Sequence, residues 1–336
     1  MSRQLALDAF FLRPTPRLAH TEYSLNYHVS GGKSLRQIYD EWDVDFVWCT
    51  DDGPIAWEKA GRCTDMGHAE YASGGADRRA AAPCPFSSPE EALEFDPLLE
   101  YGLPTRRELV RWFEESHRRR SGEFPGQLFS GGYYKSVISG AIQAFGWEML
   151  LQAAADEERF ARLLERFGRY TLEHNLAWAE TSAEVFIQHD DMVWAQGPFL
   201  RPEFYRRVLF PIYRRLWEPL RRAGKRVIFC ADGTWEMFFD DIAACGAEGF
   251  CFEPSNSLEA AVRKFGRTHV IIGSKVDCRT MTFAPWAQLR AEMDATLTLA
   301  KDCPGFVWAV GNHIPANVPD EACARYMNYL RERWRR

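Results

Sequence analysis

The 336-residue sequence lacks several patterns that would assign a function class directly. No Gly-x-Gly-x-x-Gly follows an apolar run, so nothing supports a dinucleotide-binding sheet, and the nine cysteines form no Cys-x-x-Cys pair. No stretch approaches the ~20 apolar residues that span a bilayer, and the N-terminus lacks the apolar core of a signal peptide. The net charge of −6 argues against nucleic acid as a partner, because phosphate binding needs a basic face. We therefore expect a cytoplasmic protein with reduced thiols and no membrane or nucleic-acid partner.

Short apolar runs rich in β-branched and aromatic residues recur along the chain, and six of them end in polar side chains. These six are residues 44–50, 184–188, 226–229, 249–252, 269–273 and 305–309, and a shorter run at 128–130 makes a seventh. Such runs predict buried strands. We expect an eighth strand in an irregular stretch.

Helical patterns lie between these strands. They cover residues 157–181, 202–223, 235–245, 258–265 and 285–301. Gly224 is expected to end the second in a left-handed cap, and Gly246 and Gly266 close the next two. Because strands that alternate with helices pair in parallel, the chain is predicted to be α/β, a (β/α)8 TIM barrel. Its length suits one domain over residues 1–336, with residues 1–43 as an N-terminal extension.

Barrel enzymes carry their chemistry on the loops after the carboxyl ends of the strands. Polar side chains at six predicted strand ends should therefore face one mouth: Asp52, His189, Asp232, Glu253, Asp277 and His313. Structural alternatives stay open for several of them. His189 also suits a core histidine bonded to Asp191, Asp232 suits the N-cap of the helix at 235–245, and Cys230 suits an inert buried thiol.

The order of these motifs resembles that of the uroporphyrinogen decarboxylase-like superfamily, which includes cobalamin-linked methyltransferases. The carriers are residues 61–69, Phe95-Asp96-Pro97, residues 145–148, His189-Asp190-Asp191, Ala231-Asp232-Gly233, Phe252-Glu253-Pro254, Asp277-Cys278-Arg279 and residues 311–315. The resemblance runs from about Gly61 to the end of the chain. It implies a (β/α)8 barrel with an N-terminal helical extension.

Decarboxylases of this superfamily carry an arginine-rich N-terminal loop that binds the substrate carboxylates. The matching stretch here, residues 27–33, lacks that pattern, and only Lys33 and Arg36 lie near it. A substrate with eight carboxylates needs several cations. The sequence therefore favours a divergent methyltransferase or demethylase branch.

The resemblance also implies metal ligands. Family methyltransferases often bind zinc through a His-x-Cys pair and a late cysteine; the matching positions are Cys230 and Asp232, with Asn312 and His313 near the late one. Members that demethylate aryl ethers show an acidic residue, fourteen residues, an acidic residue, twenty residues and a histidine. Asp277, Glu292 and His313 have that spacing. We predict zinc ligands among Asp277, Glu292, His313 and Cys230.

Other residues are predicted to handle substrate or cofactor. His189, Asp190, Asp232 and Glu253 are candidates for orienting the substrate or moving protons. A second group is expected to line the cofactor pocket: Tyr133, Tyr134, Trp194 and Asn312. Aromatic walls suit a flat ligand, although core packing explains the rings almost as well.

Three functions follow. The first is metal-assisted methyl transfer from a small methoxylated or methylated substrate to a corrinoid, held by a separate protein, or to another acceptor. The second is a metal-independent decarboxylase in which Asp190 and Asp232 handle protons and His313 is the general acid. The third is a non-catalytic barrel that binds a corrinoid or tetrapyrrole. A homodimer is left open.

Overall fold

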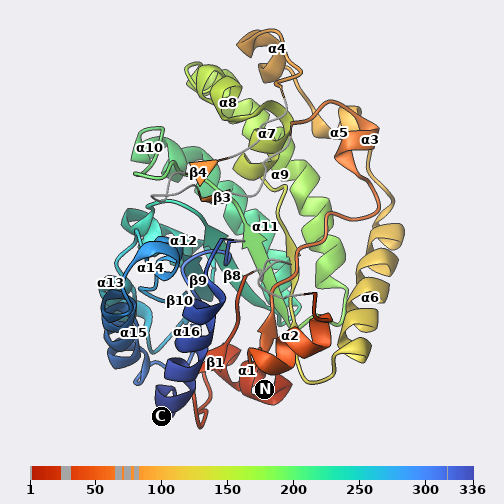
Figure 1. Ribbon diagram of the computed structural model, residues 1–336. Coiled ribbons are helices and arrows are strands. Elements are labelled where there is room, and N and C mark those ends of the chain that lie inside the picture. The colour runs from red at the N-terminus through yellow and green to blue at the C-terminus, as the bar shows by residue number, and fades with distance from the viewer. Residues whose placement is uncertain (1, 24–31, 65–69, 72–76, 79–82, 316) are drawn as a thin grey trace.

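A parallel seven-stranded sheet forms the centre of the computed structural model, which describes residues 2–23, 32–64, 70–71, 77–78, 83–315 and 317–336 (Figure 1). In sheet order the strands are β1 (Ala19–His20), β11 (Phe306–Trp308), β10 (Val270–Gly273), β9 (Gly249–Phe252), β8 (Arg226–Ala231), β7 (Val185–His189) and β6 (Gly131–Tyr133). All neighbouring pairs are parallel. Parallel pairing places their carboxyl ends at one end of the sheet.

A second parallel pair lies next to both edges of this sheet. It consists of β2 (Phe46–Val47) and β5 (Leu128–Phe129). The Asp45 amide donates to the carbonyl of His20, at the end of β1, over 2.9 Å, and β5 continues through Ser130 into β6. A short antiparallel pair, β3 (Glu70–Tyr71) and β4 (Asp77–Arg78), lies apart from these sheets.

Alternating strand residues pack into two separate apolar clusters, because successive side chains point to opposite faces of a strand. Ile187, Ile228 and Ile272 belong to the inner cluster, and Phe229 and Phe250 belong to the outer cluster against the helices. Both faces of the sheet are thus buried. This explains why the strands read as continuous apolar runs.

Helices surround the sheet in Figure 1, with α4, α7 and α8 at the top and both chain termini at the bottom. The helices are α1 (Arg3–Phe10), α2 (Leu35–Glu41), α3 (Trp57–Ala60), α4 (Pro89–Leu93), α5 (Pro97–Tyr101), α6 (Arg106–Glu123), α7 (Ile138–Phe145), α8 (Trp147–Ala153), α9 (Glu157–Ala179), α10 (Pro202–Phe204), α11 (Phe210–Arg222), α12 (Phe239–Cys245), α13 (Leu258–Phe265), α14 (Cys278–Phe283), α15 (Trp286–Ala300) and α16 (Asp320–Arg333). Helix α1 packs with the inner cluster through Leu5, Ala9 and Phe10. It covers the amino ends of the strands, so any open mouth lies at the carboxyl ends.

The predicted α/β class with parallel strands is confirmed. Five of the seven predicted runs contain a strand of the seven-stranded sheet, and the other two supply β2 and β5. Two strands of the sheet lie outside the predicted runs: β6, which follows β5, and β1, which lies inside residues 1–43. That segment, expected to be a helical extension, therefore contributes a strand as well as α1 and α2.

The predicted helices are present with altered ends. The helix predicted over 202–223 is interrupted by a π-helical turn, Tyr205–Leu209, because Pro211 has no amide hydrogen to donate to the preceding turn. Gly224 has the expected positive φ of 78°, and Gly246 has a φ of 110°. Gly266 closes α13 with a φ of −58°, so the left-handed cap is absent there.

All nine cysteines lie among the described residues and are free thiols in the structure. Within the described part of the chain, every helix is too short or too polar to cross a membrane. The motif predicted at residues 61–69 is described only as far as Thr64, and most of the stretch 27–33 likewise lies outside the described residues.

Candidate active site

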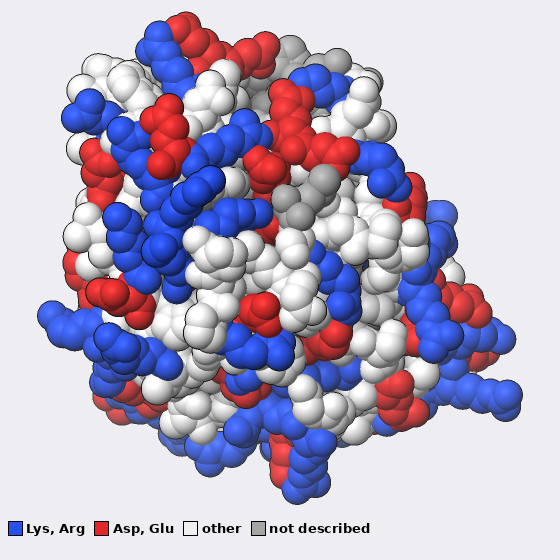
Figure 2. All heavy atoms as spheres, turned by 90° about the horizontal axis from the view of Figure 1, so that it is seen from below, with Lys and Arg blue, Asp and Glu red and all other residues white. Residues whose placement is uncertain are grey.

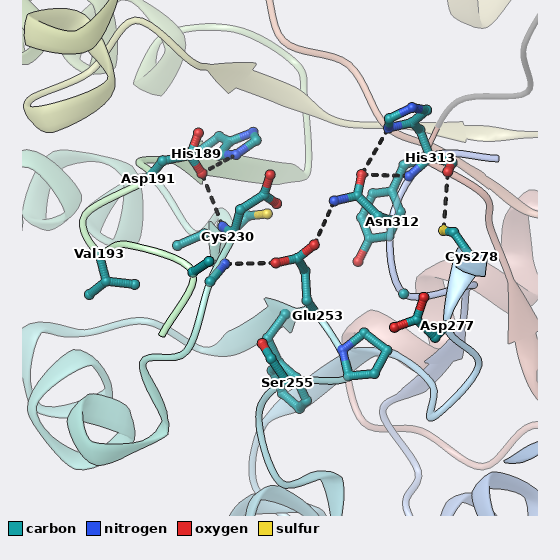
Figure 3. A pocket seen from close by; sticks show the side chains of 18 of the residues that line it. His189, Asp191, Val193, Cys230, Glu253, Ser255, Asp277, Cys278, Asn312 and His313 are labelled. Carbon is teal, nitrogen blue, oxygen red and sulfur yellow. Dashed lines mark hydrogen bonds and ion pairs between the residues drawn. The ribbon is translucent and has the colours of Figure 1, made fainter. Parts of the chain in front are cut away.

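A cavity of about 720 Å³ opens at the carboxyl ends of the strands (Figure 3). Among its lining residues are Tyr23, Trp48, Tyr134, Trp147, His189, Asp191, Trp194, Cys230, Asp232, Glu253, Asp277, Cys278, Arg279, Asn312 and His313. Most of them lie at the carboxyl ends of strands or in the loops that follow those strands. Five of the six residues predicted to face one mouth therefore share this cavity. The exception is Asp52, whose carboxylate lies 3.4 Å from Lys135 Nζ, outside the lining.

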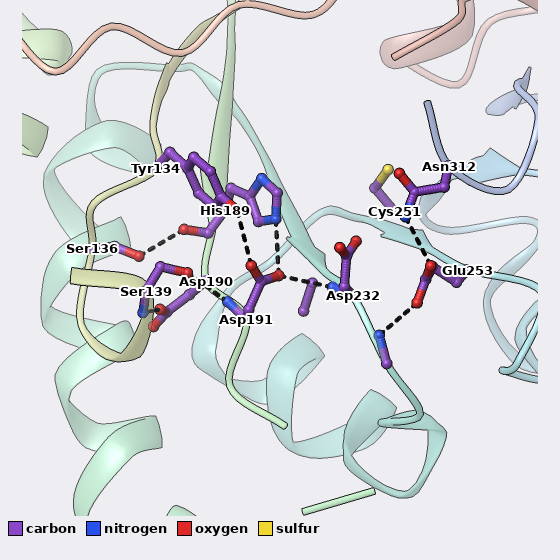
Figure 4. A network of polar contacts seen from close by, with 12 residues as sticks. Tyr134, Ser136, Ser139, His189, Asp190, Asp191, Asp232, Cys251, Glu253 and Asn312 are labelled. Atoms are coloured by element: carbon purple, nitrogen blue, oxygen red, sulfur yellow. Dashed lines mark hydrogen bonds and ion pairs between the residues drawn. The ribbon is translucent and has the colours of Figure 1, made fainter. Parts of the chain in front are cut away.

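The end of β7 supplies the most connected polar group of the cavity (Figure 4). His189 is the last strand residue and pairs with Cys230 of β8, and the chain then turns at Asp190. The turn brings Asp191 back to His189, with His189 Nε2 3.0 Å from Asp191 Oδ1. The Asp232 amide, at the end of β8, donates to the same Oδ1 over 3.0 Å. Two neighbouring strand ends thus converge on Asp191.

His189 and Asp191 form a close pair of opposite charge when the imidazole is protonated. Burial by itself would lower the pKa of His189, but the Asp191 carboxylate more than offsets burial, so the pKa is raised. Burial likewise opposes ionisation of Asp191, yet the charge and hydrogen bond of His189 hold its pKa below the usual value. The Tyr134 hydroxyl also donates to Asp191 Oδ2 over 3.1 Å. The expected bond between His189 and Asp191 is present, but both residues line the cavity, so His189 is not the core histidine of that alternative.

This cluster also has the composition of a metal site. One ligand atom each from His189, Asp191 and Asp232 lie within 4.8 Å of one another. An imidazole nitrogen and two carboxylate oxygens are ligands that zinc and similar divalent ions accept. The bonds from Tyr134 and the Asp232 amide to Asp191 supply the outer contacts that orient metal ligands. The residues therefore fit a divalent ion, provided that the Nε2 proton of His189 is released on binding.

The metal ligands that were predicted from spacing along the chain do not lie together in the structure. Within the described part of the chain, the group around His189 is the one set of three metal-binding side chains, so Asp277, Glu292 and His313 do not converge. Glu292 accepts from the Thr280 hydroxyl over 2.8 Å and from the Asp277 amide over 3.2 Å, away from the cavity lining. It lies on α15, and its carboxylate bonds the first turn of α14. Spacing along the chain could not reveal this contact.

Cys230 lines the cavity with a buried thiol. It lies beside Cys251 of β9 in the strand register, and the Tyr23 hydroxyl lies 2.5 Å from Cys251 Sγ. Burial and the neighbouring thiol raise the pKa of Cys230 well above its usual value. Because thiolate is the form that binds metals and attacks substrates, the inert alternative for Cys230 fits the structure better.

Two further predicted residues lie behind the cavity wall. Asp190 is fully buried, where its carboxylate accepts from the Ser139 amide and the Tyr213 hydroxyl, each over 2.6 Å. Tyr133 is also fully buried and stacks on His174, with ring centroids 4.4 Å apart. Neither side chain lines the cavity. Their positions support packing roles instead of the predicted contact with substrate or cofactor.

The loop after β11 forms the opposite wall of the cavity in Figure 3. Glu253 Oε2 accepts from the Gly233 amide over 2.7 Å, and its Oε1 accepts from Asn312 Nδ2 over 2.8 Å. The oxygen of the same Asn312 amide then faces His313, 3.0 Å from His313 Nδ1. An amide oxygen can only accept, so the neutral imidazole of His313 carries its proton on Nδ1. Asp232 and Glu253 therefore belong to two networks, joined through the Asp232–Gly233 backbone.

Aromatic rings form the remaining wall. Tyr134 stacks on His189, Trp48 meets the His189 ring edge to face at 5.6 Å, and Tyr23 meets Trp48 in the same manner at 5.2 Å. Trp194, which was predicted to line the cofactor pocket, contacts Trp147, and the centroids of the two rings lie 4.9 Å apart. Tyr23 was not predicted from the sequence, because β1 is only two residues long. Asp191 was predicted only as a hydrogen-bond partner of His189.

Asp232 is not the N-cap of a helix, so that alternative is wrong. The helical turn Glu236–Phe238 begins after Trp235, which makes no side-chain cap, and α12 follows it. Asp232 instead belongs to the end of β8 and faces the cavity. Its carboxylate belongs to the cluster at His189.

Comparisons with known proteins agree with this fold. Residues 138–333 match the family model for uroporphyrinogen decarboxylase (URO-D). A uroporphyrinogen decarboxylase from Pelobacter propionicus is 25% identical over 233 residues, which are 69% of this chain and 66% of that protein.

Solved structures show the same architecture. A methyltransferase from Methanosarcina mazei superposes with a TM-score of 0.67 at 17% identity, covering 98% of this chain and 97% of that one. A B12-independent methionine synthase from Shewanella sp. W3-18-1 gives a TM-score of 0.50 at 9% identity, covering 95% and 93%. At such low identities these likenesses concern the fold alone. Because the family model spans more than half of the sequence, the chain belongs to the uroporphyrinogen decarboxylase (URO-D) family.

Proposed function

We propose that this protein catalyses metal-assisted methyl transfer from a small methylated or methoxylated substrate to a corrinoid or another acceptor. The observation that carries the proposal is the convergence of His189, Asp191 and Asp232 on one point of the cavity wall. The metal-ligand set proposed here replaces the one expected from spacing. The methyltransferase likeness supports the proposal at the level of the fold.

In the proposed reaction the bond between the methyl carbon and a heteroatom breaks, and its electron pair stays on the heteroatom. An electron pair of the acceptor forms the new bond to the methyl carbon. A bound metal would supply Lewis acidity to the departing heteroatom, on which negative charge develops. His313, whose Nδ1 proton is held by Asn312, can exchange a proton with the substrate only at Nε2.

The charge of the cavity argues against a polyanionic substrate. Four carboxylates line it (Asp191, Asp232, Glu253 and Asp277), and Arg279 is the one lysine or arginine among the described lining residues. A tetrapyrrole with many carboxylates would meet net repulsion there. The second candidate is decarboxylation of a smaller substrate, favoured by the decarboxylase relative and by the His189–Asp191 ion pair, which could move a proton without a metal.

Metal analysis separates these two functions. The parent protein grown with added zinc should contain about one equivalent of divalent metal by mass spectrometry, and chelation should abolish methyl transfer. His189→Ala and Asp232→Asn should each retain little metal, since losing one of three protein ligands weakens a site severely. His313→Ala, the matched control on the opposite wall, should retain parental metal content. Metal in none of the four proteins would favour the metal-free decarboxylase.

We also infer a closed (β/α)8 barrel, in which β2 and the continuous β5–β6 segment fill the space between β1 and β7. Two backbone hydrogen bonds of Asp45, the residue before β2, support this closure. Its amide donates to the His20 carbonyl of β1, and its carbonyl accepts from the Leu128 amide of β5 over 2.9 Å. A corrinoid protein, a second copy of this chain and a cytoplasmic location remain predictions from the sequence.

A further inference from the structure

Negative charge is concentrated in the cavity. The end of the molecule that holds both termini carries acidic and basic side chains together (Figure 2). Among the described residues that line the cavity, by contrast, four carboxylates face one arginine. Arg279 Nη1 lies 3.7 Å from Asp277 Oδ1, and the arginine side chain is half exposed. Its positive charge therefore mainly neutralises the Asp277 carboxylate. The cavity therefore attracts cations.

A bound divalent metal would neutralise only part of this negative charge. With the carboxylates ionised and His189 neutral as a ligand, a divalent ion and Arg279 together neutralise three of the four negative charges. One negative charge remains at the wall. A substrate carrying a single positive charge would complete the balance.

Glu253 is the carboxylate placed to receive that charge. Both of its oxygens are held, by the Gly233 amide at 2.7 Å and by Asn312 at 2.8 Å, but these donors are neutral. In the described part of the chain, no lysine or arginine nitrogen lies within 4.0 Å of its carboxylate. Figure 3 shows Glu253 between the wall of His189 and the wall of His313, where its carboxylate faces the cavity. Two fixed hydrogen bonds orient it for an incoming ligand.

The aromatic wall selects the kind of cation. Trp48 lies nearly perpendicular to the rings of Tyr23 and His189, with interplanar angles of 67° and 75°, and Trp147 lies at 87° to Trp194. Walls that meet at such angles offer ring faces from several directions to a rounded group. Aromatic faces bind alkylated ammonium through their negative π-electron density, and an alkylated ammonium has few N–H groups that would otherwise need acceptors.

We propose that the cavity recognises an alkylated ammonium group on the substrate, with Glu253 supplying charge and Trp48 and its neighbours supplying ring faces. The inference rests on the proposed function in taking this cavity as the substrate site. Ammonium recognition is a binding property, separate from the metal and from the bond that breaks. It is therefore testable without turnover.

The test is calorimetric titration with choline and with its uncharged isostere 3,3-dimethylbutan-1-ol, on metal-free and zinc-loaded parent protein. Choline should bind to both forms at least tenfold more tightly than the isostere. Equal binding of the two ligands, or binding of neither, would overturn the inference even if metal content and methyl transfer were as proposed. If the protein binds choline selectively but never binds metal, the ammonium site is supported and the proposed metal-assisted reaction is contradicted.

Two variants and a control localise the effect. Glu253→Gln and Trp48→Leu should each weaken choline binding at least tenfold and leave binding of the isostere within about threefold. Glu165→Gln removes an equal charge from the exposed pair with Arg215 and should bind choline as the parent does. Circular dichroism of each variant establishes folding, and if Glu253→Gln does not fold, Trp48→Leu decides the matter alone. Unchanged selectivity in folded variants would overturn the assignment.

Discussion

The ring of Tyr134 lies almost flat on that of His189, with centroids 4.0 Å apart and an interplanar angle of 25°. Its hydroxyl meanwhile donates to Asp191 Oδ2. One side chain thus fixes the orientation of two of the three candidate ligands. The Asp232 amide holds the same Asp191 carboxylate from the other side, through Oδ1.

Tyr134→Phe tests this orienting role. The variant keeps the ring stack but loses the bond to Asp191, so metal affinity should fall about tenfold, as is usual when an outer contact of a metal ligand is removed. A chelator competition titration measures the change. Tyr329→Phe, which removes a hydroxyl bond to Asp294 on the surface, is the control. Equal affinities in Tyr134→Phe and the parent would show that Asp191 is placed without Tyr134.

Asn312→Ala tests the link between Glu253 and His313. Without the amide oxygen, His313 should lose its preference for the Nδ1–H tautomer, which ¹⁵N NMR of the imidazole detects directly. The kcat/KM for methyl transfer should fall about tenfold or more, within the range for a misoriented proton-transfer group. The melting temperature should change little, because Asn312 is only partly buried. A parental NMR signature would contradict the assignment of the tautomer.

Gly233 and Gly224 form a matched pair for backbone strain. Their φ angles are 77° and 78°, but a Cβ on Gly233 would lie 2.6 Å from the Trp194 carbonyl oxygen, whereas a Cβ on Gly224 meets nothing within 4 Å. Gly224→Ala should cost about 1 kcal/mol of unfolding free energy from the positive φ alone. Gly233→Ala should cost at least about 2 kcal/mol more from the backbone clash. Urea denaturation measures both, and similar losses would show that the Trp194 loop moves freely.

His174 should make stability depend on pH. Burial lowers the pKa of His174 to about 4. The unfolded state then binds a proton more readily than the folded state, so this residue's contribution is complete above pH ~6.5 and is lost as the pH falls toward about 4. The full loss is about 3 kcal/mol. His174→Gln should lack this slope in urea denaturation at pH 7, 6 and 5; parallel curves for parent and variant would refute the assignment.

Much of the fold follows from local patterns. Strands such as Gly249–Phe252 and Val270–Gly273 are continuous apolar runs bounded by glycine or polar residues, and a run of that kind is stable only when both of its faces are buried. Glycines mark several helix ends for a similarly local reason. The strand Ala19–His20 was not predicted, because two residues give no periodicity and its pairing depends on Phe306–Trp308 far along the chain.

The candidate site, like the fold, was predictable from the sequence only in part. Alternation along a strand sends Tyr133 to the helices and Tyr134 to the cavity, but only the direction of the assembled sheet decides which of the two goes inward. The sequence by itself determined that polar side chains end the strands and that Glu253 and His189 are among them. The tertiary structure decided that Asp191 and Asp232, rather than Asp277 and Glu292, share a point with His189. It did so because ligand atoms meet through the turns after adjacent strands, and those turns are set by packing and not by spacing along the chain.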